Sequence, residues 1–302
     1  MPSSARRIAA ASIVAAQVLS SAGRGASAQT APDRSAEVLA AARAALGGES
    51  RLAAVKTLVA TGRTRQLRGD NLVPIEFEIQ VEFPDRYARR DEFPAQDNGP
   101  ATTGFSGARL VQDPPAPVPP PRAGAPPLTP EQQAAALAGP IDAVKQDFAR
   151  LMLGMFASSF GSFPLTFVYV AQAEAPQGKA DVLDVTGPAN FRARLFISAD
   201  THLPIMVTWQ AAPPPARRGG PPPGAGPPAG TSGPRSAGPP PGAGAGPAAP
   251  PVEQRLYFAD YRSVDGLQWP FRIRRAVGAD TTEETIFDRF RINARVDARR
   301  FQ

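Results

Sequence analysis

The stretch DYRSVDGLQWPFRIRR, residues 260–275, decides the fold class. A turn signal, Asp265-Gly266, separates two runs that are typical of strands. After the turn, alternate positions are apolar: Leu267, Trp269, Phe271 and Ile273. Arg272 and Arg274 fall on the other face, so the pattern predicts a hairpin with one wet and one dry face. The dry face covers either a packed core or something that the protein carries.

Many other segments predict strands. Alternation is clearest at 75–81, 191–198 and 203–209, and further strands are predicted at 57–66, 85–92, 108–112, 165–171, 180–185, 252–261 and 283–291. With the hairpin strand this gives about eleven strands. The run 165–171 is apolar on both faces, which is typical of a strand between a sheet and a helix. Because the turns are short, the sheet is predicted to be an antiparallel meander.

Helices are predicted in two places. Asp33 is the expected N-cap of a helix through Leu46, which the pair Gly47-Gly48 ends. Thr129 is the expected N-cap of a second helix, with Pro130 and Gln132 at favourable positions. Pro140 is expected to break or kink it. Apolar residues then continue at helical spacing: Ile141, Val144, Phe148, Leu151, Met152 and Met155.

The elements together predict a mainly β fold of the α+β class. A large sheet with one apolar face must cover that face, and only two or three helices are present to do so. A strongly curved sheet wrapped around these helices is the simplest architecture. Where the helices do not fill the concave side, an apolar cavity remains.

The first 28 residues predict a secretory signal peptide. A basic start is followed by an apolar run of only twelve residues, 8–19, and by the A-x-A site Ala26-Ser27-Ala28. Residues 29–302 are then one domain with no membrane span, in the periplasm or secreted. The chain has no cysteine, which excludes a thiol nucleophile, a thiolate metal site and a bacterial lipid anchor.

Charge and low-complexity segments add little functional signal. The formal net charge is +6, but basic and acidic residues are mixed near the C-terminus, so a nucleic-acid groove is not expected. Residues 113–130 and 211–251 are rich in proline and are expected to be disordered insertions. They are more often passive loop expansions than Pro-rich recognition ligands.

No catalytic constellation stands out, and we do not expect an enzyme. The single histidine, His202, lies in a turn. The run 104–107, GFSG, lacks the spacing and context of a nucleophile elbow. Asp181 and Asp184 lie three apart in a predicted strand and so point to opposite faces. No cofactor loop and no metal-ligand spacing is present.

Several segments, in their order, resemble the LolA/LolB-like class of periplasmic lipoprotein-sorting and lipid-binding proteins. They are ALGGESRLAAVKTLVATG (45–62), DFARLMLGMF (147–156), GKADVLDVTG (178–187), LFISADTHLPIMVTW (195–209), DYRSVDGLQWPFRIRR (260–275) and FRINARVDARRF (290–301). The resemblance covers nearly all of residues 29–302 except the Pro-rich segments. It implies an incomplete antiparallel β-barrel whose apolar concave face is lidded by helices and holds acyl chains.

One family feature is missing. The family has an arginine directly before a proline at the turn after the second strand, which helps to hold the lid shut. The matching position here is Phe83-Pro84, and the role is not transferred to the nearby Arg86. The missing arginine argues against regulated lipoprotein transfer, whereas binding of an apolar ligand is still expected.

The leading hypothesis is a carrier or binding protein for a lipid, a lipoprotein acyl chain or another hydrophobic small molecule. Apolar burial would drive binding. The candidate lining residues are Phe77, Ile79, Phe148, Leu151, Met152, Met155, Phe167, Leu195, Ile197, Val207, Trp269, Phe271 and Ile273. For each of them, plain core packing is the alternative. The rival functions are an envelope sensor that contacts another protein, and a fold whose cavity is filled by its own side chains.

Overall fold

The computed structural model describes residues 31–69, 71–94, 99–115, 129–175, 178–212 and 250–302. The predicted signal peptide and most of both Pro-rich segments lie outside the described residues. Within the described part, no helix is long and apolar enough to cross a membrane. The strands are β1 (Thr57–Arg68), β2 (Asn71–Glu82), β3 (Arg86–Glu92), β4 (Ala101–Ser106), β5 (Arg109–Asp113), β6 (Thr166–Ala175), β7 (Gly178–Gly187), β8 (Phe191–Ser198), β9 (Pro204–Ala211), β10 (Val252–Val264), β11 (Leu267–Val277) and β12 (Asp280–Ile292).

These strands form one 12-stranded sheet with the order β5-β4-β3-β2-β1-β12-β11-β10-β9-β8-β7-β6. Consecutive strands pair in antiparallel fashion, except β5 and β6. The first and last strands of the chain, β1 and β12, also pair with each other. The two end strands, β5 and β6, do not pair with each other, so the sheet stays open. The predicted α+β fold with an incomplete antiparallel barrel is confirmed, with 12 strands where about eleven were expected.

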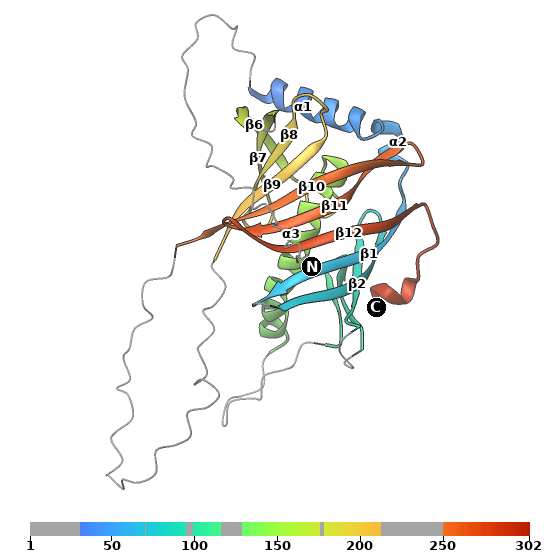
Figure 1. Cartoon of the computed structure of the whole chain (residues 1–302). Coiled ribbons are helices and arrows are strands. Elements are labelled where there is room, and N and C mark those ends of the chain that lie inside the picture. Colours follow the sequence, from blue (N-terminus) through green and yellow to red (C-terminus); the bar gives the residue numbers. More distant parts are fainter. Residues whose placement is uncertain (1–30, 70, 95–98, 116–128, 176–177, 213–249) are drawn as a thin grey trace, which may run out of the picture.

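The helices are α1 (Ala31–Ala45), α2 (Glu49–Ala53), α3 (Pro130–Phe156) and the 3₁₀-helix η1 (Ala298–Phe301). The chain leaves the sheet at one end strand, β5, and returns at the other, β6, and α3 lies on the segment between them. The α3 helix therefore crosses the concave side of the sheet, whereas α1 packs near β6 (Figure 1). This route makes α3 the main cover of the apolar face.

The predicted hairpin of β10 and β11 is confirmed. Asp265 and Gly266 have φ angles of 52° and 77°, the positive values that a tight primed turn requires. The four predicted dry-face residues of β11 are all buried, and Trp269 has an exposed fraction of 0%. The Arg272 side chain is half exposed and pairs with Asp260 at 3.2 Å on the wet face.

Four details differ from the sequence-based expectations. The strand β4 was not predicted, because its residues 101–106 show no clear alternation of apolar and polar side chains. The α1 helix begins at Ala31, two residues before the expected cap Asp33. Although Pro140 lies inside it, α3 is continuous, because an N-terminal capping box and the buried C-terminal half stabilise it on both sides.

The fourth difference concerns β6, which was expected to be buried on both faces. It is an end strand of the sheet, and its outward side chains Val168 and Val170 are 51% and 45% exposed. Only the inward side chains, such as Phe167 and Tyr169, pack against the core. The doubly apolar pattern misled the prediction because the outer face of this strand has no covering layer in the described residues.

Candidate functional site

The α3 helix places an apolar face against the concave side of the sheet. The capping box of Thr129 and Gln132 fixes its start, and Ala157, with a left-handed φ of 47°, ends it. The buried face carries Phe148, Ala149, Met152, Leu153, Met155 and Phe156. Since methionine is unbranched and flexible, this face can adapt its shape more readily than a face of Leu and Ile.

The predicted lining residues all belong to one hydrophobic cluster between α3 and the sheet. All of them are buried except Leu151 and Phe167, which are partly buried. Five line one small inner cavity: Ile79, Phe148, Leu151, Met152 and Met155. The other eight pack elsewhere in the same cluster; Phe77, for example, meets Phe287 edge to face at 5.3 Å.

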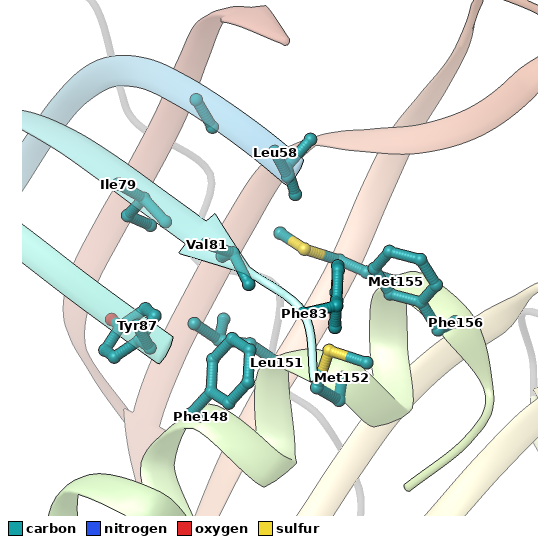
Figure 2. A pocket seen from close by; sticks show the side chains of 11 residues that line it. Leu58, Ile79, Val81, Phe83, Tyr87, Phe148, Leu151, Met152, Met155 and Phe156 are labelled. Carbon is teal, nitrogen blue, oxygen red and sulfur yellow. The ribbon is translucent and has the colours of Figure 1, made fainter. Parts of the chain in front are cut away.

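The inner cavity is lined by apolar and aromatic side chains from α3 and the sheet (Figure 2). Its volume is about 10 Å³, which is the space of about one water molecule. Besides the five predicted residues it is lined by Leu58, Ala60, Val81, Phe83, Tyr87 and Phe156. The packing of α3 on the sheet is therefore nearly complete, and any larger ligand requires side chains of α3 to move.

A second, open pocket lies beside the inner cavity, where α2, the β2–β3 turn and the end of α3 meet. We call it the end pocket. Its volume is about 320 Å³. It is lined by Arg43, Glu49, Leu52, Ala53, Val55, Lys56, Phe83, Pro84, Met152, Phe156, Ser158, Ser159, Phe160 and Gly161. Phe83, Met152 and Phe156 line both spaces, so these three side chains form the wall between them.

The rim of the end pocket carries two cations and one carboxylate. Arg43 lies 3.4 Å from the Glu49 carboxylate and donates from Nε to the Ala157 carbonyl at 3.3 Å. Lys56 donates to the Ala53 carbonyl at 3.2 Å. No ion pair joins Lys56 to a carboxylate among the described residues, so the rim carries an excess of positive charge.

A polar bridge of Lys145, Ser162 and Asp85 ties α3 to the β2–β3 turn. The Lys145 ammonium donates to Ser162 Oγ at 3.0 Å, and Ser162 Oγ donates to Asp85 Oδ1 at 2.6 Å. The Ser162 backbone N–H also donates to Asp85 Oδ1 at 3.2 Å. This bridge lies at the turn where the resembling family has its lid arginine. Arg86 instead forms an ion pair with Glu82 at 3.0 Å.

Another polar cluster fastens α1 to the opposite end of the sheet. The buried Asp181 carboxylate accepts from the Tyr169 hydroxyl at 3.3 Å and lies 3.5 Å from Arg34 of α1. Burial, with a further contribution from Asp181, raises the pKa of Tyr169. Asp184 points outward and pairs with Arg194 at 2.7 Å, so the two aspartates face opposite sides as predicted. This cluster has a structural role.

Arg150 is a buried cation on the side of α3 that faces β8 and β9. Its guanidinium lies 4.2 Å from the Trp209 ring centre and 2.8 Å from the Asp147 carboxylate. Burial lowers its pKa, although Asp147 opposes the shift. The aromatic contact therefore replaces part of the hydration that the cation loses.

His202 lies in the β8–β9 turn with a left-handed φ of 57°. Among the described residues, no group of three or more His, Asp or Glu side chains is arranged to hold a metal ion.

Sequence reasoning missed several lining residues and the end pocket as a whole. Phe156 carried a usable signal, because it follows Met152 by four positions on the same helical face. Phe83 and the pocket rim carried no such signal, because α2, the β2–β3 turn and the end of α3, which are distant in sequence, meet there.

No protein-family model matches the sequence, and no curated protein matches it. Solved structures do match. A LolA superfamily protein from Nitrosomonas europaea aligns with a TM-score of 0.50 at 10% identity, covering 89% of this chain and 97% of that one. An outer membrane lipoprotein-sorting protein domain from Vibrio parahaemolyticus aligns with a TM-score of 0.44 at 9% identity, with the same coverage. This chain therefore has a LolA-like fold.

Proposed function

We propose that this protein is a periplasmic binding or carrier protein that holds a hydrophobic molecule between α3 and the concave face of the sheet. A lipid or the acyl chain of a lipoprotein is the expected class of ligand. The observation that carries the proposal is that α3 covers the apolar face of the sheet. One helix with a face rich in Phe and Met lies across the apolar side of an open sheet, with an inner cavity and an end pocket at the joint.

Binding requires the interior to expand. Ligand sites of small molecules are typically about 300–1,000 Å³, far above the inner cavity. Met152 and Met155 supply the adaptable part of the wall. Each apolar Å² that the ligand buries contributes about 25 cal/mol, which offsets the packing energy that the core gives up when α3 side chains move apart.

The location is part of the proposal. Residues 1–28 have the pattern of an export signal, and the periplasm is where a carrier between two membranes is needed.

Extraction of the protein from a periplasm, followed by mass spectrometry of the extract, tests the proposal. We expect a co-purifying lipid and uptake of the neutral fluorescent probe N-phenyl-1-naphthylamine. Leu151→Glu places a charge at the partly exposed edge of the inner cavity and should abolish probe uptake. Ile205→Glu, at an exposed position of β9, is the matched control. A protein without extractable lipid and without probe uptake would contradict the proposal.

A second candidate is a partner-binding function in the cell envelope, favoured by one observation. The end strand β6 exposes Val168 and Val170, and unpaired strand edges readily accept another strand. In that case an envelope protein cross-links to the wild type in cells, and the double variant Val168→Asp/Val170→Asp abolishes this cross-link. Probe uptake by the same variant stays unchanged.

A further inference from the structure

The end pocket combines an apolar floor with a cationic rim. Leu52, Val55 and Phe160 are buried floor residues, whereas Arg43 and Lys56 stand at the rim. A pocket of this composition suits an amphiphile, since an apolar chain needs the floor and a charged head group needs the rim.

The wall behind the pocket is thin and contains a flexible side chain. Phe83 and Phe156 meet edge to face at 5.4 Å, and Met152 completes the wall between them and the inner cavity. Of the three wall side chains, Met152 is the unbranched and flexible one, so it is the member of the wall that changes rotamer most readily. The geometry is that of an access route leading into the interior.

The charges at the rim define the head group. Arg43 is shared between Glu49 and a carbonyl oxygen at 3.3–3.4 Å, which are long and weak contacts for a guanidinium. Among the described residues, the Lys56 ammonium donates to the Ala53 carbonyl and pairs with no carboxylate. Two acids adjoin the pocket residues Phe83 and Pro84, but Asp85 accepts from Ser162 of the polar bridge and Glu82 pairs with Arg86. Both cations are therefore free to exchange weak partners for an anion.

We infer that the end pocket is the access route and head-group site for a single-chain anionic amphiphile with a carboxylate head, such as a long-chain fatty acid. The carboxylate is held by Lys56 and Arg43, and the chain passes Met152 into the interior. The inference rests on the proposed function, which it sharpens by naming the ligand class and the point of access.

Two matched probes separate this inference from the proposed function. The probes are the polyene fatty acid cis-parinaric acid and the corresponding alcohol, whose chain is the same but whose head is uncharged. We expect the double variant Lys56→Gln/Arg43→Gln to bind the acid about tenfold more weakly. Binding of the alcohol should change less than twofold. Arg63→Gln removes an exposed cation on β1 and serves as the control.

The absence of cysteine provides a second test of the route. Ser159→Cys at the pocket rim can be labelled with a bulky maleimide. Thr281→Cys, at the start of β12 and away from the pocket, can be labelled in the same way. Labelling at Ser159→Cys should slow the uptake of both probes at least tenfold, and labelling at Thr281→Cys should not.

The outcomes are distinguishable. If the wild type binds neither probe, the proposed function fails and the inference with it. If both probes bind but the double variant weakens them equally, or labelling at Ser159→Cys leaves uptake unchanged, only the inference is overturned.

Discussion

Gly154 is a point of close approach between α3 and the sheet, and its substitution gives a quantitative test of how the helix packs there. A Cβ atom at this position would lie 2.1 Å from Cε1 and 2.2 Å from Cζ of Phe258 on β10. Ordinary carbon contacts lie at about 3.5–4.0 Å, so the ring or the helix must shift by about 1.5 Å.

Two opposing contributions decide the effect of Gly154→Ala. Alanine gains about 1 kcal/mol over glycine in a helix interior. Overpacking a core costs about 1–3 kcal/mol. Phe258 is buried, and the hydroxyl of Tyr261 donates to the Gly154 carbonyl at 2.9 Å, so the contact has little room to relax. The overpacking cost therefore lies in the upper part of its range, at about 2–3 kcal/mol, and subtracting the helix-propensity gain leaves a net loss of about 1–2 kcal/mol in the free energy of unfolding, or about 2–8 °C in Tm.

Urea denaturation followed by fluorescence measures this change, because Trp209 and Trp269 are both buried. Ala138→Gly, at an exposed position of the same helix, measures the propensity contribution alone and should cost about 1 kcal/mol. Phe258→Leu in the Gly154→Ala background should restore part of the loss, with a coupling energy above about 0.5 kcal/mol. A Gly154→Ala protein as stable as the wild type would refute the close seating of α3.

Three further predictions concern the polar bridge, the buried tyrosines and the unpredicted strand. Ser162→Ala leaves the buried Lys145 ammonium without its acceptor and should lower the free energy of unfolding by about 1–3 kcal/mol. The control Ser158→Ala should change it by less than about 0.5 kcal/mol, and equal effects of the two variants would contradict the bridge. Burial raises the pKa of Tyr87 and Tyr261 above the ordinary value near 10, so the stability that the neutral hydroxyls contribute is complete below pH about 10 and is lost as the pH rises further. The variant Tyr87→Phe/Tyr261→Phe should therefore flatten the fall in the free energy of unfolding between pH about 10 and 12, and an unchanged slope would count against this reasoning. Gly104→Ala places a Cβ 2.0 Å from the Tyr87 carbonyl oxygen and should speed amide hydrogen exchange throughout β3, β4 and β5. Faster exchange confined to residue 104 would contradict this prediction.

The sequence was most informative where one physical rule dominates. Strand alternation predicted the β10–β11 hairpin because burial on one face enforces a period of two. It failed at β4, where Gly104 interrupts the alternation. The glycine is there because β4 approaches the backbone of β3 too closely for a side chain. It also failed at β6, since residue types alone do not reveal that a strand ends a sheet.

The candidate site was predictable only in part. Helical spacing identified Phe148, Met152 and Met155 as the face of α3 that meets the sheet. The volume left beneath the helix depends on how side chains from distant segments interdigitate, which no local pattern encodes. A row of aromatic rings, among them Phe105, Phe160 and Phe163, fills space that the sequence left open for a cavity.

The central claim is that a hydrophobic ligand is held between α3 and the concave face of the sheet. Photo-cross-linking with a fatty acid that carries a diazirine near its methyl end tests it most directly, with the modified residues identified by mass spectrometry. The account predicts labels on Met152, Met155 and Phe156 of α3 and on Ile79 of β2, which meet at the inner cavity. Labels confined to the outer face, at Val168 and Val170 of β6, would contradict it.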